Sequence, residues 1–383
     1  MQERHIETPE QLATLCESVR DSQWLALDTE FMREKSYHPQ LCLLQLCNGQ
    51  LAASVDPLVL ETLDPLLEIL YDPKIVKIFH AGRQDLEIFH YLWGRLPTPL
   101  FDTQLAATLL GLGEQVGYGN LVRQLLGRDL EKGHTRADWS RRPLQTDQLR
   151  YALDDVIYLG EIYQRFRERL RDLGREAWLA DDFELLADPA TYITEPRMAW
   201  QKIKGRQKLK GVQLAVLQAL ADWRETEAQR VNKPRRWILK DEVMLDLSRQ
   251  QTGSMEQLQQ IRGLEVGTLK RQGKTLLQIV QRARQLPRTE WPQESGIPPR
   301  LSPNQEALAD LLMCSLRLVA ETNAISPTAL GSRKDLERLA SGERDLDILH
   351  GWRGALAGET LLKVLAGDAA PRMDNGRLTL AAG

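Results

Sequence analysis

Hydrophobic positions in the first half of the chain change from a strand pattern to a helical one. Between residues 24 and 79, short apolar runs such as WLALDTEF, LCLLQLC and KIVKIFH alternate with turn residues and one helical stretch near 58–70. Runs of this length bounded by turns indicate strands. After residue 80 the spacing becomes helical, apart from a short strand at PLFDT. This half of the chain therefore predicts an α/β domain whose sheet is flanked by helices.

The second half of the chain shows helical periodicity only. Strand patterns end near TEPRM (194–198), and amphipathic segments run from about 208 to 285. The stretch LPRTEWPQESGIPPR (286–300) holds four prolines and reads as a linker to a second helical block. The predicted domains are 1–195, 206–290 and 301–370, the last two being small all-α bundles. A chain cut after about residue 195 is then expected to remain folded.

The two helical blocks resemble each other. GKTLLQIV at 273–280 aligns with GETLLKVL at 358–365, an offset near 85 residues. Outside this piece the match is loose, for example between PRRWILKDEVMLDL and TNAISPTALGSRKDL. We interpret the blocks as two copies of one helical bundle, of which the second is more divergent.

Composition limits the class of protein. No apolar run among the 383 residues approaches the roughly 18 to 20 that a membrane span needs, and the start MQERHIETPE lacks the features of a secretory signal. A cytoplasmic protein without a membrane contact or an obligate protein partner is expected. The four cysteines form no CxxC pair and are expected to be reduced packing residues: Cys16, Cys42, Cys47 and Cys314.

Charge is distributed unevenly along the chain. Residues 201–290 hold 19 Lys and Arg against 9 Asp and Glu, whereas residues 1–200 hold 21 against 32. A basic middle segment beside an acidic half predicts a polyanion-binding module attached to a part that can hold cations. A basic face that is merely solvated is the alternative.

Carboxylates mark the ends of two predicted strands. In LALDTEF, Asp28 and Glu30 are two residues apart, so both side chains point to one face. Two like charges held this close favour a hard divalent cation between them. Asp85 follows the strand KIVKIFH in the first turn of the next helix, where an acidic residue also suits the helix dipole. A His80, Asp85 and His90 metal site is the weaker alternative, since a spacing of five places these residues on different helical faces.

A third motif, YALDDVIYL, lies within a predicted long helix. Tyr151 and Asp155 are i,i+4 neighbours on one face, an arrangement that suits orienting a water beside a metal. Asp154, at i+3 from Tyr151, is the neighbour most easily mistaken for the ligand. A tyrosine that only packs in the core is the alternative interpretation.

The motifs together resemble a known family. DTE, then Asp85 after a strand, then Y-x-x-x-D is similar to the DEDD superfamily of 3′→5′ exonucleases, in the subgroup with Tyr before the last Asp. The segments DTEFMREKSYHPQLCLLQL, FHAGRQDLEIF, PLFDTQLAATLLG and DWSRRPLQTDQLRYALDDVIYL resemble the ribonuclease D family over about residues 20–175. The helical blocks resemble the domains that this family shares with RecQ-type helicases.

The resemblance implies a fold and a chemistry. The fold is a ribonuclease-H-like mixed sheet with helices on both sides. The activity is hydrolysis of RNA from its 3′ end to nucleoside 5′-monophosphates, typically on tRNA precursors with 3′ extensions. Two Mg²⁺ or Mn²⁺ ions are implied, with Asp28, Glu30 and Asp155 on one, Asp28 and Asp85 on the other, and Tyr151 positioning the attacking water. Four carboxylates and no covalent nucleophile fit a two-metal mechanism independently of the family.

The basic helical segment offers candidate RNA contacts. The stretch KPRRW places Lys233, Arg235 and Arg236 beside Trp237, which suits phosphate contact with base stacking. Trp200 and Trp223 are further stacking candidates, although at least two of the three tryptophans are expected to be core anchors. The glycines of IRGLEVG (261–267) either open a helix N-terminus to a phosphate or make a tight turn, which we prefer.

Two other functions remain open from the sequence. A DNA 3′→5′ exonuclease of the same superfamily would use identical chemistry. A non-catalytic RNA-binding scaffold is disfavoured, because all four carboxylates are intact.

Overall fold

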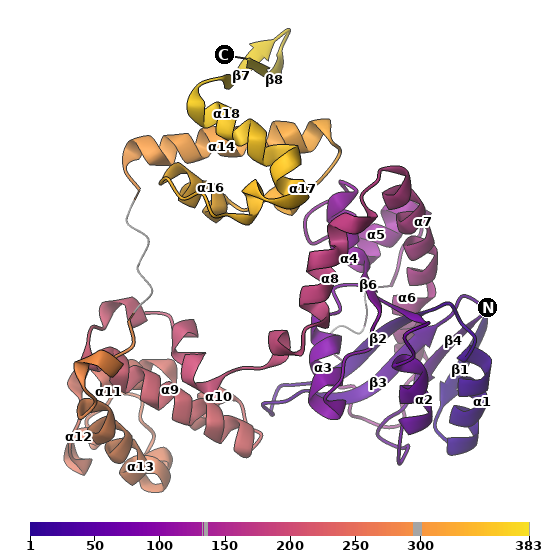
Figure 1. The fold of residues 1–383 in the computed structure, drawn as a ribbon. Helices are drawn as coiled ribbons and strands as arrows, with labels where there is room; N and C mark the ends of the chain where they lie inside the picture. The colour runs from indigo at the N-terminus through magenta and orange to yellow at the C-terminus, as the bar shows by residue number, and fades with distance from the viewer. Residues whose placement is uncertain (132, 134–136, 294–300, 383) are drawn as a thin grey trace. The chain divides into compact units, whose positions relative to one another are not determined.

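The computed structural model describes residues 1–131, 133, 137–293 and 301–382, which form two compact units (Figure 1). The first unit contains residues 1–30, 41–191 and the C-terminal segment that begins at Leu301. The second contains residues 31–40 and the segment that begins at Tyr192. The predicted third domain is thus part of the first unit rather than a separate body.

The first unit is built on a six-stranded sheet with the order β1-β4-β3-β2-β5-β6. Strand β1 pairs with β4 in parallel, β3 pairs with β4 antiparallel, and β5 runs parallel to β2 and β6. The mixed sheet that the family resemblance implies is therefore confirmed. The strands are β1 (Gln2–Ile6), β2 (Trp24–Met32), β3 (Gln40–Cys47), β4 (Leu51–Val55), β5 (Val76–Phe79) and β6 (Leu100–Asp102).

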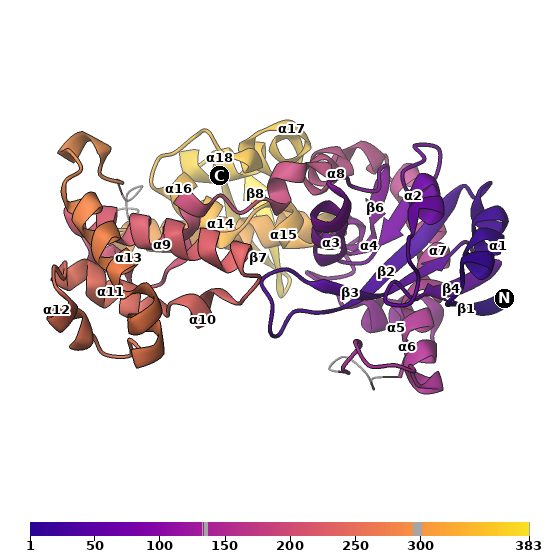
Figure 2. The same cartoon turned by 90° about the horizontal axis from the view of Figure 1, so that it is seen from below.

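Helices cover both faces of this sheet. Figure 2 shows α1, α2 and α3 on one side and α5 and α6 on the other. Each buries an apolar stripe; helix α1, for example, starts with a capping box between Thr8 and Gln11 and buries Leu12, Leu15 and Val19. The helices are α1 (Pro9–Val19), α2 (Asp64–Leu70), α3 (Arg83–Trp93), α4 (Thr103–Leu109), α5 (Tyr118–Leu126), α6 (Thr146–Ile157), α7 (Leu159–Asp172) and α8 (Ala180–Ala187).

The C-terminal segment ends in a hairpin that the sequence reading missed, since it placed all strands before residue 194. Asn375 and Gly376 both have positive φ, 47° and 79°, as a two-residue hairpin turn requires. The Asn-Gly pair in the sequence indicates a turn, but the small residues and the proline in the first strand hide the strand pattern beside it. The elements are α14 (Pro303–Thr322), α15 (Pro327–Leu330), α16 (Arg333–Ala340), α17 (Gly351–Arg353), α18 (Glu359–Ala366), β7 (Ala369–Asp374) and β8 (Arg377–Ala382).

This C-terminal segment shares the hydrophobic core of the sheet domain. Leu312 and Leu316 of α14 belong to the same buried cluster as residues of β6, α4 and α7. The buried Arg175 donates from Nη1 to the carbonyl of Leu109 at 2.7 Å and from Nη2 to that of Asn323 at 2.6 Å. Removing the segment would uncover this core, so we expect a chain that ends near residue 195 to be less stable than the sequence suggested.

Aromatic stacking and a backbone bond join the same two segments. The rings of Trp178 and Trp352 lie parallel, with centroids 4.6 Å apart. The amide of Ser326 donates to the carbonyl of Thr108 at 2.8 Å, next to Gly111, where a Cβ would lie 2.8 Å from the carbonyl oxygen of Ala324. Gly111 has φ 70°, so both its conformation and its surroundings call for glycine.

The second unit is a helical bundle with its own buried core. Its order of a long helix, a one-turn helix and a third helix recurs in α14, α15 and α16, in agreement with the repeat suggested by the sequence. Gly263 has φ 81° and turns the chain between α12 and α13, which matches the preferred reading of IRGLEVG. The helices are α9 (Val212–Arg230), α10 (Arg235–Ile238), α11 (Asp241–Gln250), α12 (Met255–Gln259) and α13 (Val266–Arg284).

Two further expectations concern cysteines and membranes. The cysteines are free thiols; Cys16, Cys42 and Cys47 are buried and Cys314 is half-buried. Within the described residues, no helix combines the length and the apolar character that crossing a bilayer demands.

Candidate active site

Three of the predicted carboxylates converge at β2, which continues to Met32, so Asp28 and Glu30 lie within the strand rather than at its end as the sequence suggested. Asp28 and Glu30 project from one face of the strand, and Asp155 approaches from α6. One oxygen from each of the three lies within 4.8 Å of the others. Carboxylate oxygens at this spacing can share a hard divalent cation.

Asp85 lies beside this group, and a residue of β2 holds its carboxylate in place. It occupies the first turn of α3, is 7% exposed, and accepts a hydrogen bond from the hydroxyl of Thr29, which lies between Asp28 and Glu30. Its charge still raises the pKa of both neighbours on β2. Asp85 is therefore close enough to act with the group, although it is not one of the three residues within 4.8 Å.

The turn that brings Asp85 to the sheet is fixed by a residue that the sequence reading did not single out. Asp102, 2% exposed, accepts from the amide of Gly82 at 2.8 Å and from that of Ala81 at 3.3 Å. It also caps α4. Gly82 can be nothing larger, because a Cβ there would lie 2.5 Å from Cβ of Phe79. The signal for Asp102 in the sequence was its place at the end of the short strand in PLFDT, directly before a helix.

Tyr151 lies on α6, four residues before Asp155, and its ring centroid is 6.2 Å from that of the buried Trp139. The segment that carries Trp139 is tied to the sheet by Arg142. This arginine pairs with the fully buried carboxylate of Asp56 and donates to the carbonyls of Cys42 and Trp139 at 2.7 and 2.8 Å. The sequence reading missed Arg142, since its partner is 86 residues away.

Asp154 has a different environment from Asp155. Its carboxylate pairs with Arg150 at 2.6 Å, and Arg150 also pairs with Glu3 at 2.6 Å. Its backbone carbonyl accepts a hydrogen bond from the hydroxyl of Tyr118 at 3.0 Å. Asp154 is thus an ion-paired residue next to the site, and it is not one of the three carboxylates that converge at β2. Tyr118 holds the turn of α6 that carries Asp155 and was not anticipated.

Burial and mutual repulsion raise the pKa values of the site carboxylates. The pKa of Glu30 rises to about 8 through burial and then the charges of Asp155 and Asp85. That of Asp155 rises to about 7 and that of Asp85 to about 6, in both cases mainly by burial. The pKa of Asp28 is raised well above its usual range by burial and by the three other carboxylates. The carboxylates of such a cluster repel one another when they are ionised, and a bound cation offsets this repulsion.

The alternative histidine site is not formed. The ring nitrogens of His80 lie 2.9 Å from the hydroxyl of Thr103 and 2.9 Å from the carbonyl of Val116, so both have protein partners. Neither His80 nor His90 belongs to a group of three metal-ligand side chains anywhere in the described part of the chain.

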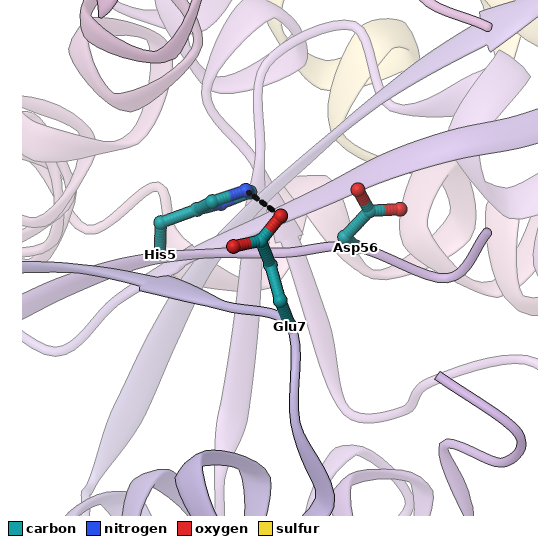
Figure 3. A group of neighbouring side chains, drawn as sticks. All are labelled: His5, Glu7 and Asp56. Carbon is teal, nitrogen blue, oxygen red and sulfur yellow. Dashed lines mark ion pairs between the residues drawn. The ribbon is translucent and has the colours of Figure 1, made fainter. Parts of the chain in front are cut away.

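A second group of potential ligands, His5, Glu7 and Asp56, lies at the end of β1 (Figure 3). Figure 3 shows the ring of His5 directed at Glu7, with a nitrogen to oxygen distance of 3.5 Å. Both carboxylate oxygens of Asp56 are already bound by Arg142. Asp56 is therefore neutralised by Arg142, which leaves Glu7 and the ring of His5 as ligands, fewer than the three carboxylates that meet at Asp28.

Comparisons with known proteins agree with this geometry. Residues 4–171 match the 3′-5′ exonuclease family, and residues 213–280 match the HRDC domain. Ribonuclease D of Granulibacter bethesdensis is 41% identical, with 98% of this chain and 95% of that protein covered. The chain belongs to the ribonuclease D family. The crystal structure of Escherichia coli RNase D, described as an exoribonuclease involved in structured RNA processing, matches with a TM-score of 0.82 and 34% identity over 96% of this chain and 99% of that one.

Membership in the ribonuclease D family defines the reaction. The chain is a hydrolytic 3′→5′ exoribonuclease with a ribonuclease-H-like catalytic domain and a helical HRDC domain, and it uses divalent metal. The fold class and the enzyme class predicted from the sequence are thereby confirmed.

Arg235, one of the predicted RNA contacts, is engaged inside the second unit. Its Nε and Nη2 donate to the carboxylate of Glu225 at 2.6 Å each, and its guanidinium lies 4.6 Å from the ring centre of Tyr37. The hydroxyl of Tyr37 donates to the same carboxylate. These contacts favour a structural role for Arg235, which joins residues 31–40 to α9.

The other predicted contacts are accessible. Trp237 is 58% exposed, with Nζ of Lys233 at 6.0 Å from its ring centre, and Arg236 is exposed. Trp200 is 3% exposed, and Trp223 packs against the core of the bundle. Two of the three tryptophans are therefore core anchors, as expected, and Trp237 alone of the three is a stacking candidate.

Proposed function

We propose that this chain trims the 3′ ends of tRNA precursors and other small RNAs, releasing nucleoside 5′-monophosphates, with two Mg²⁺ or Mn²⁺ ions per active site. The observation that carries the proposal is the convergence of Asp28, Glu30 and Asp155, whose oxygens lie within 4.8 Å of one another. No activated nucleophile is needed for such chemistry.

The side chains present fit divalent ions. The carboxylates supply the hard oxygen donors that divalent ions prefer. Their raised pKa values are typical of a cation-binding cluster whose negative charge is not yet balanced by a metal. Asp28, Glu30 and Asp155 would hold one ion, and Asp28 with Asp85 the other. When bound, such ions lower the pKa of water and stabilise the leaving oxygen in phosphodiester hydrolysis.

The protein's own groups supply the positioning. Tyr151 projects from the same face of α6 as Asp155, so its hydroxyl is suited to orienting the attacking water. Glu30 is the candidate for contact with the terminal ribose. Thr29 holds Asp85 against β2, and Asp102 holds the turn before α3.

The HRDC domain is proposed to hold RNA through backbone phosphates. Residues 201–290 carry 19 basic against 9 acidic side chains, and phosphate contacts supply most nucleic-acid affinity. Lys233, Arg236 and Trp237 remain the candidate contacts, while Arg235 is assigned to the contact with Glu225. A cytoplasmic site of action belongs to the same proposal and is tested by cell fractionation.

The test is an assay on a tRNA bearing extra 3′ nucleotides, with and without Mg²⁺. Stepwise shortening from the 3′ end, release of 5′-monophosphates and loss of activity in EDTA are expected. Equal or faster digestion of a DNA oligonucleotide of matched sequence would favour the DNA exonuclease alternative.

A further inference from the structure

Two hollows on the second unit share one residue, Arg236. The cationic pocket, of about 180 Å³, has four basic residues in its lining: Lys202, Arg224, Arg235 and Arg236. The tryptophan pocket, of about 350 Å³, is lined by Arg236 and Trp237 together with residues of α11 and of the turn before α13. Two sequence features noted separately, KPRRW and IRGLEVG, therefore meet at one place.

The cationic pocket has a surplus of positive charge. Its acidic residues are Glu225, which pairs with Arg235 at 2.6 Å, and Asp241, which pairs with Arg224 at 2.5 Å. The exposed Lys202 and Arg236 are then the surplus. Arg236 also reaches Glu242, but at 3.6 Å and with both side chains about 70% exposed this pair is weak.

Arg224 also lines this pocket and has one donor without an acceptor. This residue is 4% exposed, and its Nη1 donates to the carbonyl of Leu239 and to Asp241. Its Nε has no hydrogen-bond partner among the described residues. Arg224 thus lines the pocket as a buried cation whose hydrogen-bonding capacity is not filled by the protein.

The tryptophan pocket offers a surface for a base. Trp237 is among the most exposed large apolar side chains of the second unit, at 58%. Lys240 closes part of the pocket and pairs with Glu265 at 2.9 Å. Proteins that bind single strands without sequence preference stack the bases on exposed aromatic rings that have cations beside them.

We propose that the two pockets form one subsite for single-stranded RNA, with a base stacked on Trp237 and an adjacent backbone phosphate in the cationic pocket. Arg236 contacts both parts, and Lys202 and Arg224 join it at the phosphate. The proposal rests on the proposed function and adds to it the residues that hold the strand away from the catalytic carboxylates.

The experiment measures binding of a fluorescent single-stranded RNA to the full-length protein in EDTA, by anisotropy, between 50 and 300 mM KCl. Trp237→Ala should raise Kd roughly 5- to 100-fold, since stacking is lost, and Trp237→Phe should restore most of the affinity. Lys202→Ala and Arg236→Ala should each reduce the slope of log affinity against log salt by about 0.7. Lys274→Ala removes an exposed charge of α13 that lines neither pocket, and should change Kd less than about twofold.

Equal Kd values for Trp237→Ala and Lys274→Ala, or a Trp237→Phe variant as weak as Trp237→Ala, would overturn the subsite. Circular dichroism of each variant separates lost binding from lost folding. A wild-type protein that binds and shortens RNA while these variants behave like the control would refute the subsite alone. A wild-type protein that neither binds nor shortens RNA would refute the proposed function as well.

Discussion

Metal binding at the active site should release protons near neutral pH. Without metal, burial raises the pKa of Glu30 to about 8, that of Asp155 to about 7 and that of Asp85 to about 6, while burial and then the other three carboxylates raise the pKa of Asp28 well above its usual range. At pH 7 the pKa values of Glu30 and Asp155 alone leave more than one proton on this cluster, which a divalent cation must displace. The logarithm of metal affinity should therefore rise by more than one for each pH unit near pH 7.

The raised pKa values also determine how the stability of the metal-free protein changes with pH. These carboxyls have folded-state pKa values above their unfolded values, so the metal-free protein gains from them at acid pH. That gain is fully present below their ordinary pKa values of about 4 and is lost as pH rises from there to about 8. Urea unfolding of the metal-free protein should show falling stability across this range, and added Mn²⁺ should reverse the fall.

Calorimetric titration of Mn²⁺ into the metal-free protein, in two buffers of different ionisation enthalpy, counts the released protons directly. Release should shrink between pH 6 and pH 9, as the cluster loses its own protons. Fewer than about half a proton at pH 7, with an affinity that is flat between pH 6 and pH 8, would refute the coupling of these carboxylates.

Three further substitutions test the active site and the packing of the fold. Tyr151→Phe should lower the single-turnover rate about 10² to 10⁴-fold with little change in metal affinity, whereas an unchanged rate would make Tyr151 a core residue. Gly82→Ala should cost roughly 1 to 3 kcal/mol in urea unfolding, because its Cβ would overlap Phe79; a neutral effect would contradict the tight turn. Leu316→Ala, at a fully buried site, should cost about 2 to 5 kcal/mol and destabilise the catalytic domain with the C-terminal segment, and separate unfolding transitions would disprove their shared core.

Local patterns were enough to predict the catalytic group. Asp28 and Glu30 share a face because strand side chains alternate, and Tyr151 and Asp155 share one because helical neighbours are four apart. That Asp155 meets β2 followed only from the family resemblance, since the two elements are more than a hundred residues apart. The strand and helix patterns of the first half were readable for the same local reasons.

Long-range partners could not be read from the chain. Arg175 was one arginine among many on an amphipathic stretch, and only the fold shows it bonded to Leu109 and Asn323. Arg235 looked like an RNA contact because its neighbours are basic, while its partner Glu225 lies ten residues earlier on another helix. Linker prolines likewise suggested an independent third domain, whereas buried leucines of α14 join it to the catalytic core.

The most direct test of the account compares Asp28→Asn with Asp154→Asn on a 3′-extended RNA at saturating Mg²⁺. Asp28→Asn keeps the shape of the side chain but removes the charge proposed to serve both ions, so hydrolysis should fall to below about a tenth of the wild-type rate, with the fold intact by circular dichroism. Asp154→Asn alters only an ion pair with Arg150 beside the site and should have a mild effect. Residual activity of Asp28→Asn above about a tenth of wild type, or an equal loss in both variants, would contradict the assignment of the metal site to Asp28 and its neighbours.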